Sequence, residues 1–169
     1  EPFQGQPREF QTLRYHDPQT HAFKELSADI PWDVESLDIS DDGHYLAYTT
    51  NEDGIQRLHV LTLPDHEAVR LPELPVGLIG GVSFSPDGKR VASADNGQII
   101  RLWDVASGSL IRELSGKAGN IVRYAPQGDV LAVGGYYADR IRLFDAKTGD
   151  QLREIYQNGR SFMFSDDGK

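Results

Sequence analysis

The chain has 169 residues, a mass of 18.8 kDa, no cysteine and a formal net charge of −9. This length suits one domain with a hydrophobic core, and the lack of cysteine excludes disulfides, thiolate zinc sites, iron–sulfur clusters and a cysteine nucleophile. The acidic balance argues against binding to the phosphate backbone of nucleic acids, and no apolar run approaches the roughly 20 residues of a membrane-spanning helix.

Charge is distributed unevenly along the chain. Residues 1–84 contain 5 basic and 15 acidic residues, whereas residues 85–169 contain 12 basic and 11 acidic residues. The histidines all lie in the first half: His16, His21, His44, His59 and His66. The asymmetry indicates an acidic face, two segments of different origin, or simple drift of charge over solvated loops.

One four-residue turn recurs along the chain at nearly constant spacing. Its copies end at Gly43, Gly88, Gly128 and Gly168, which are 45, 40 and 40 residues apart. Three copies read Ser-x-Asp-Gly, and the third in order reads Ala-Pro-Gln-Gly. Each follows a short alternating apolar stretch, and three are followed by another. This pattern predicts β-hairpins, because glycine tolerates the positive φ of a tight turn.

A second predicted hairpin alternates with the first. Its opening strands are expected at residues 13–17, 58–62, 100–104 and 141–145, and its closing strands at 23–26, 68–71, 110–114 and 152–155. Each period of 40 to 45 residues therefore predicts four short strands, and no segment predicts a convincing helix. Four-stranded units at this period are typical of β-propeller blades. A β-sandwich is the competing architecture, but it does not require a regular period.

We therefore expect an all-β fold, a β-propeller of four-stranded antiparallel blades, in one domain over residues 1–169. The approximate blades are 12–27 (the second half of a blade), 34–74, 80–115, 120–156 and 160–169 (the first strand of a blade). Joining the two ends would give about four blades, three complete and one composite. The alternatives are half of a larger ring that a second copy completes, and a truncated chain.

The second half of the chain resembles the WD-repeat family. The stretches that carry the resemblance are residues 84–94, 100–108 and 141–149. Trp103-Asp104 in one stretch becomes Phe144-Asp145 in the next. The resemblance covers about residues 82–169 and implies a propeller in which these four residues, and the recurring glycines, are structural repeat positions. The Gly-His dipeptide that is common near blade starts in that family is absent.

The first half resembles a different kind of propeller. Residues 33–54 and 76–88, within a region of about 12–94, are similar to the propeller of prolyl oligopeptidase-type serine peptidases. That propeller precedes a hydrolase domain and restricts substrate entry. Because the two resemblances overlap near residues 85–94, the chain is interpreted as a natural propeller of mixed blades or as a chimera. It contains no Gly-x-Ser-x-Gly elbow and no histidine after His66, so we expect no enzyme activity.

Metal and cofactor sites are not expected. The five histidines flank turns and strand ends without the convergence that a zinc site needs. Asp41-Asp42 and Asp166-Asp167 lack the alternating spacing of a calcium loop, and aspartate is common in turns because it bonds its own backbone.

The candidate partner-binding residues are aromatic and basic residues of predicted loops: Trp32, Tyr136, Tyr137 and Arg140. These loops gather at one end of a propeller, where exposed rings suit a protein partner, although the same rings can pack between blades. We expect a non-catalytic scaffold that binds a protein, a peptide or a second copy of itself, and neither nucleic acid nor membrane. The rival hypotheses are the substrate-gating propeller of a peptidase and an engineered propeller without a natural ligand.

Overall fold

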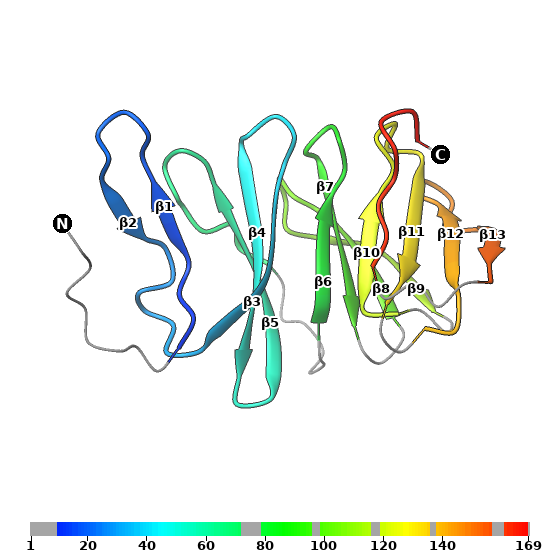
Figure 1. Cartoon of the computed structure of the whole chain (residues 1–169), viewed down its shortest axis with the longest axis horizontal. Helices are drawn as coiled ribbons and strands as arrows, with labels where there is room; N and C mark the ends of the chain where they lie inside the picture. Colours follow the sequence, from blue (N-terminus) through cyan, green and yellow to red (C-terminus); the bar gives the residue numbers. More distant parts are fainter. Residues whose placement is uncertain are drawn as a thin grey trace.

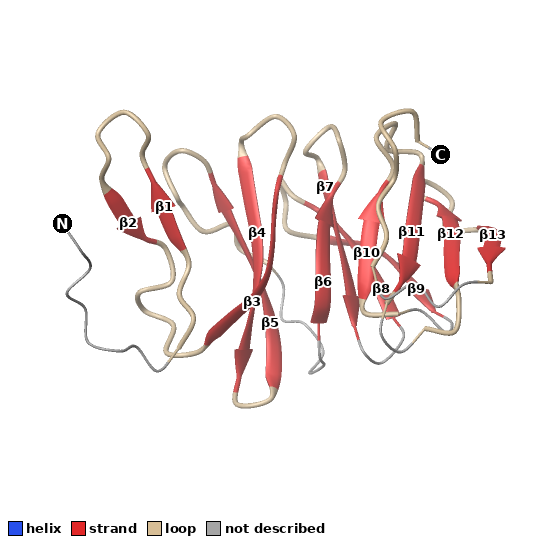
Figure 2. Cartoon of the chain, viewed as in Figure 1, coloured by secondary structure: helices blue, strands red, loops and turns tan. Residues whose placement is uncertain are grey.

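The computed structural model describes residues 10–71, 79–95, 99–115, 119–135, 138–156 and 161–168. In this part of the chain there are thirteen strands in four antiparallel sheets, and no helix (Figure 2). Each sheet is built from strands that follow one another in sequence, so every connection within a sheet is a hairpin. The all-β prediction is confirmed.

The sheets are named here by their order along the chain. The half-blade contains β1 (Arg14–His16) and β2 (Phe23–Glu25). Blade I contains β3 (Asp33–Ile39), β4 (Tyr45–Glu52) and β5 (Ile55–Thr62). Blade II contains β6 (Ile79–Phe84), β7 (Arg90–Asp95), β8 (Ile99–Asp104) and β9 (Leu110–Ser115). Blade III contains β10 (Ile121–Tyr124), β11 (Val130–Gly134), β12 (Ile141–Asp145) and β13 (Gln151–Ile155).

The four sheets stand side by side in chain order, with the first strands of blades I, II and III in mutual contact through the pairs β3–β6 and β6–β10 (Figure 1). This is the arrangement of a partial β-propeller, in which each sheet packs its faces against the sheets before and after it.

The hydrophobic core consists of three layers, one between each pair of neighbouring sheets. Alternation along a strand builds these layers, because successive side chains point to opposite faces. On β8, Trp103 packs toward blade I with Val60, whereas the adjacent Leu102 packs toward blade III with Leu131. A single strand thus contributes to two core layers.

Two predicted strands differ from the structure. Residues 68–71 form only an isolated bridge between Leu61 and Ala68, together with a 2.8 Å hydrogen bond from the Val69 N–H to the Val60 carbonyl. Pro72 and Pro75 follow in the sequence, and proline has no N–H with which to extend a ladder. Blade I therefore has three regular strands rather than four.

The second difference concerns residues 160–169, predicted as the first strand of a blade. Residues 162–164 are not in a strand, and in the described part of the chain they pair with no other strand. Phe162 nevertheless packs beside Gly134 of β11, as the next layer of the propeller would require. In Figure 1 this segment lies over blade III, far along the row from the half-blade, so the described residues do not assemble the composite fourth blade.

Candidate functional site

The recurring turns lie together at one end of the strands. Their glycines all have positive φ, between 65° and 77°, and each glycine N–H donates a 2.8 Å hydrogen bond to the carbonyl three residues before it. We call this surface the turn face and define it by residues 40–43, 85–88, 125–128 and 165–168. Figure 1 shows the β3–β4, β6–β7 and β10–β11 turns on the same side of the molecule.

A serine hydroxyl rigidifies three of these turns. Ser40, Ser85 and Ser165 each donate a 2.6 Å hydrogen bond to the aspartate two residues later. Ser85 also accepts a 3.0 Å hydrogen bond from the Arg90 N–H, which closes the hairpin. The turn at 125–128 has alanine in place of serine and lacks these contacts. The repeated serine therefore fixes the position of a carboxylate at the surface of the turn.

Neighbouring turns touch across the gaps between blades. A Cβ added to Gly88 would lie 2.9 Å from a carboxylate oxygen of Asp42, and one added to Gly128 would lie 3.2 Å from Pro86. Gly168 is beside Gln127 in the same way. The turns thus form a continuous row, and glycine is needed there both for its φ and for this close approach.

The turn face carries negative charge. Hydrogen bonds from Ser40 and Ser85 lower the pKa values of Asp42 and Asp87 below their ordinary range, so both carboxylates are ionised at neutral pH. Asp41 and Asp166 are exposed beside them. The opposing charges are Lys89 and Arg90, which follow the second turn, and His44, which lies 3.1 Å from Asp42.

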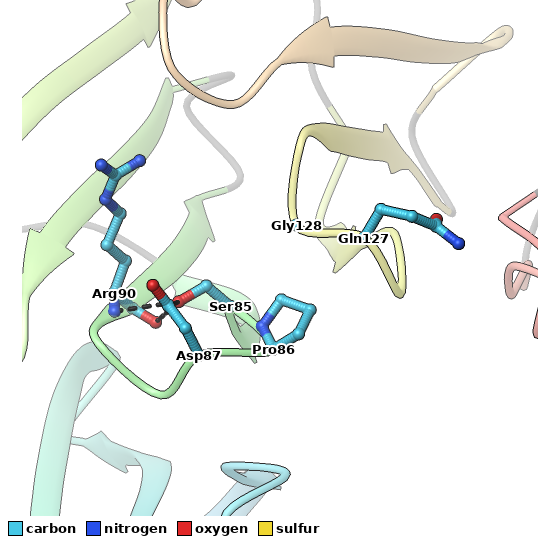
Figure 3. Close-up of a pocket in the computed structure, with 6 residues that line it drawn as sticks. All are labelled: Ser85, Pro86, Asp87, Arg90, Gln127 and Gly128. Carbon is cyan, nitrogen blue, oxygen red and sulfur yellow. Dashed lines mark hydrogen bonds between the residues drawn. The ribbon is translucent and has the colours of Figure 1, made fainter.

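A cleft of about 400 Å³ opens on the turn face between blades II and III (Figure 3), lined by Ser85, Pro86, Asp87, Arg90, Gln127 and Gly128. It contains one cation and one anion, so its lining does not favour either sign of ligand charge. Nearby, burial raises the pKa of Tyr124 to about 12, which keeps this phenol protonated and neutral.

The second hairpins have turns that the sequence pattern only partly revealed. Asp17, Asp104 and Asp145 each accept hydrogen bonds from backbone N–H groups two or three residues later. The residue four positions after each has positive φ, with histidine at His21 and glycine in the other two turns. Histidine in this left-handed conformation is uncommon. The alignment of His21 with Gly108 and Gly149 in the repeat was the sequence signal that indicated it, and the sequence analysis did not use it.

The candidate partner-binding residues are not brought together. Trp32 is half-buried between the half-blade and β3, with its ring centroid 5.9 Å from that of Phe10. Arg140 belongs to blade III, where it forms 2.6 Å ion pairs with both Asp139 and Glu154. Those hydrogen bonds raise its pKa further above the ordinary arginine value. Tyr136 and Tyr137 lie outside the described residues.

Arg140 also lies over the ring of Tyr156, 4.7 Å from its centroid, a geometry that favours a cation–π contact. Its charge is therefore balanced within the blade, while the Tyr156 ring itself remains largely exposed. Tyr156 is a surface aromatic residue that sequence reasoning did not select, because nothing in its flanking residues distinguishes it from a buried strand residue.

The structural repeat positions on the strands have distinct roles. Trp103 is buried and donates a 3.1 Å hydrogen bond from its indole N–H to Ser93. Phe144 occupies the equivalent place in blade III and is also buried. Asp104 and Asp145 follow them and anchor the second-hairpin turns, as described above.

Within the described ranges, no group of three or more histidine, aspartate or glutamate residues is arranged to hold a metal ion. A search of the same residues for a helix long and apolar enough to cross a membrane found none.

Comparison with known proteins supports a WD-repeat type of propeller. Residues 59–104 match the WD40 family, described as "WD domain, G-beta repeat". Over 106 residues, 58% of the chain, the sequence is 34% identical to an uncharacterized WD repeat-containing protein of Synechocystis sp.. The matched part is 28% of that protein's length, so the match spans little more than a quarter of the relative.

Among solved structures, the chain is similar to a chain of the mitotic checkpoint complex, with a TM-score of 0.70. The superposition covers 88% of this chain and 44% of that chain, at 17% identity, a level at which the similarity concerns the fold. The WD40 match runs across residues 85–94, where two propeller types were expected to meet. The comparisons therefore support neither the prolyl oligopeptidase resemblance nor a chimeric or engineered origin.

Proposed function

We propose that the chain is a non-catalytic scaffold that binds proteins, and that its turn face binds a basic segment of a partner. The observation that carries this proposal is the row of ionised carboxylates on turns that serine hydroxyls and neighbouring blades hold in place. Fixed charges attract an oppositely charged partner without an ordering cost on the scaffold side.

The comparisons agree with this general function. The solved structure similar to this chain belongs to the mitotic checkpoint complex, and the Synechocystis relative is a WD repeat-containing protein. The fold itself supplies a rigid platform, because core layers on both faces of blade II fix the strands that display the turns. A basic peptide, rather than a nucleic acid, is the expected ligand class for an acidic surface.

The test is a titration of the chain with a lysine- and arginine-rich peptide, followed by NMR of the backbone amides. Shifts should concentrate in the turn face and should weaken with salt, because the Debye length shortens to about 3 Å at 1 M. An acidic peptide of the same length should not bind. Shifts spread over the whole surface, or binding that is independent of salt, would contradict the proposal.

A matched pair of variants locates the interaction. Asp41→Asn with Asp166→Asn removes two exposed charges from the turn face without touching the serine–aspartate bonds. Asp29→Asn with Asp53→Asn removes the same charge from connections at the other ends of the strands. The first pair should weaken binding by roughly three- to ten-fold, mainly through the association rate, whereas the second pair should leave it nearly unchanged.

The second candidate surface is the opposite end, where Tyr156 is exposed and where the four residues selected from sequence were expected. Tyr156→Ala tests it directly. A loss of protein binding in this variant, with binding retained in the Asp41/Asp166 variant, would show that the partner binds at that end instead of at the turn face.

A further inference from the structure

One position of the repeat holds an arginine in three sheets and a histidine in the fourth. Strand pairing places an arginine opposite a glutamate in the half-blade, blade II and blade III: Arg14 with Glu25, Arg101 with Glu113 and Arg142 with Glu154. The equivalent residue of blade I is His59, which, like Arg101, lies opposite the residue five positions after the turn glycine. Blade I therefore has a side chain that titrates near neutral pH where the other sheets have a permanent cation.

The partner of this side chain changes with it. Arg101 is buried and forms a 2.7 Å ion pair with Asp95, seven positions after the turn glycine. The residue at that place in blade I is Thr50, whose hydroxyl oxygen lies 2.8 Å from Nε2 of His59. Because the Thr50 hydroxyl donates its proton to Glu52 at 3.1 Å, the neutral His59 ring must donate from Nε2. An ion pair in blade II is thus a pair of neutral groups in blade I, and protonation of His59 occurs at Nδ1.

Burial disfavours the charged form of His59. Its ring stacks on the buried ring of Tyr48, with the centroids 4.7 Å apart. This burial is the main reason that the pKa of His59 is below its ordinary value of 6.5. In blade I the repeat has therefore placed a titratable group where a charge is not matched by a dedicated carboxylate.

The charged groups around His59 oppose one another. The carboxylate of Glu52 lies 3.7 Å from Nε2 and favours the protonated ring, whereas Arg57 disfavours it. Arg57 also bonds Glu52 at 2.6 Å and so shares that carboxylate with the ring. On the adjacent strand β3, Glu35 is bonded by Gln56. Neither carboxylate is thus held for His59 in the way that Asp95 is held for its arginine.

His66 forms a second titratable contact, directly with the half-blade. Its ring centroid lies 5.0 Å from that of Tyr15, and its Nδ1 is 3.2 Å from the Lys24 ammonium nitrogen. An ammonium group can only donate, so Nδ1 must be unprotonated to accept this hydrogen bond. Burial, followed by the Lys24 charge, holds the pKa of His66 below its ordinary value, and Asp65 opposes this effect. Protonation at Nδ1 would remove the contact and bring two cations together.

Both histidines lie at the core layer between the half-blade and blade I. Tyr48, on which His59 stacks, belongs to this layer, and His66 reaches from blade I to β1 and β2. The half-blade region contributes three apolar side chains to the layer: Leu13, Leu26 and Ile30. The sequences of blades II and III contain no histidine, so mild acid acts on one layer of the propeller and not on the others.

We propose that the contact between the half-blade and blade I is a pH-sensitive latch, which is closed while His59 and His66 are neutral and opens when both rings take up a proton. Opening separates β1 and β2 from blade I and uncovers the apolar layer that contains Tyr48. The latch uses no residue of the turn face, so this inference goes beyond the proposed function and does not depend on it.

The direction of the effect follows from proton linkage. Both histidine pKa values are lower in the closed state than the ordinary value of 6.5, so the open state binds more protons in mild acid. The latch is fully stable above the ordinary pKa and loses stability as the pH falls from there through the closed-state pKa values. Ordinary carboxylates titrate near pH 4, so a comparison between about pH 7.5 and pH 5.5 isolates the histidines.

The experiment is backbone amide hydrogen exchange of the labelled full chain, measured by NMR at these two pH values and corrected for the intrinsic pH dependence of exchange. Protection of the β1 and β2 amides should fall at least about ten-fold at the lower pH, because a two-stranded sheet without packing is marginally stable in water. Amides of β7 and β8 should keep their protection. Titration of the histidine ring protons in the same sample should give pKa values below 6.5 for His59 and His66.

A double variant removes the titration and keeps the hydrogen bonds. His59→Gln retains a neutral donor toward Thr50, and His66→Asn suits the positive φ of 62° at that position. This variant should have the same β1 and β2 protection at both pH values. The matched control is His21→Asn, which replaces another histidine of positive φ, in the turn of the half-blade, and should lose protection in acid as the unmodified chain does.

The results that would overturn the proposal are distinct. They are an equal fall of protection in all sheets, a fall that persists in the double variant, and ring pKa values of 6.5 or above for the two histidines. If the double variant does not fold, the ring titration and the exchange pattern of the unmodified chain decide. Binding of the basic peptide to the turn face is measured at about pH 7.5, where the latch is closed, so the two proposals fail separately.

Discussion

Blades II and III have the same four-stranded topology but place different chemistry at the same position. In blade II, Trp103 donates an indole hydrogen bond to Ser93 across the sheet. In blade III the two equivalent residues are Phe144 and Val133, and both are buried apolar side chains. Blade III thus has apolar groups in place of both the indole donor and the hydroxyl acceptor. As a result, no buried polar group is left there without a partner.

The ion pairs of the two blades differ in a related way. Arg101 in blade II is buried and pairs with Asp95 at 2.7 Å and Glu113 at 2.8 Å. In blade III the buried Arg142 reaches Asp139 at 3.3 Å, and the Asp139 side chain is 57% exposed. Arg142 also pairs with Glu154 at 3.2 Å, and Glu113 in blade II is 45% exposed. Blade II thus encloses the Arg101–Asp95 pair, whereas the Arg142–Asp139 pair of blade III is open to water. The two blades therefore share their shape more closely than they share the hydrogen bonds and ion pairs that stabilise it.

The largest expected effect is the loss of the Trp103 side chain. Trp103→Ala should destabilise the chain by about 3–5 kcal/mol, because it leaves a cavity between blades I and II and an unpartnered Ser93 hydroxyl. Phe144→Ala should cost less, since no hydrogen bond is lost. Urea unfolding of both variants measures the difference, and an equal or greater loss for Phe144→Ala would contradict the role assigned to the hydrogen bond.

Removal of the enclosed carboxylate comes next. Asp95→Ala should destabilise by about 3 kcal/mol, because it leaves one side of the buried Arg101 guanidinium without its partner. Asp139→Ala in blade III should change stability little, since exposed pairs are screened by solvent. Thermal unfolding at low and high salt compares the two. A salt-sensitive loss in the Asp95 variant would show that its pair is open to solvent after all.

A double-mutant cycle then isolates the Trp103–Ser93 hydrogen bond. Ser93→Ala alone should lower the free energy of unfolding by about 1–2 kcal/mol, because it leaves the buried indole N–H without a hydrogen-bond acceptor. In a Trp103→Phe background the same change should cost about 1 kcal/mol less. The four free energies of unfolding give the coupling directly, and additive costs would mean that the bond contributes nothing.

The smallest of the structural effects is expected at the turns. Ser85→Ala should cost about 1 kcal/mol, because Ser85 bonds both Asp87 and the Arg90 backbone. Ala125→Ser with Gln127→Asp installs the same bonds in blade III and should stabilise the chain by about 0.5 kcal/mol. A loss of stability in the installed turn would show that Pro126 or the neighbouring Gly168 does not tolerate them.

The same turn predicts a small pH dependence. The Ser85 hydroxyl is the main reason that the pKa of Asp87 is below its ordinary value of 3.8. The folded pKa is lower than the unfolded one, so the stabilisation is complete above the unfolded pKa and is lost as the pH falls through the folded pKa. The stability difference between the chain and Ser85→Ala should therefore shrink below about pH 4. A difference that stays constant down to pH 2 would contradict this assignment.

Much of the fold could be predicted because short-range patterns encode it. The spacing of Gly43, Gly88, Gly128 and Gly168 located every first-hairpin turn, and each of these glycines has the expected positive φ. Strands β9 and β13 were also predicted at nearly the observed positions. The candidate binding residues were harder to judge, because exposure and pairing depend on neighbours that are distant in sequence. Arg140 illustrates this, since Glu154 is on the adjacent strand.

By itself, the sequence determined the propeller repeat, the hairpin turns and the absence of a cysteine-based or elbow-type catalytic site, because these depend on residue type and local spacing. Only the tertiary structure decided that the turns form one acidic row, that Arg140 is paired, and that Leu37 and Ile39 lie uncovered. The physical reason is that each blade buries its faces against its neighbours. Identical patterns can therefore be core in one blade and open surface in another.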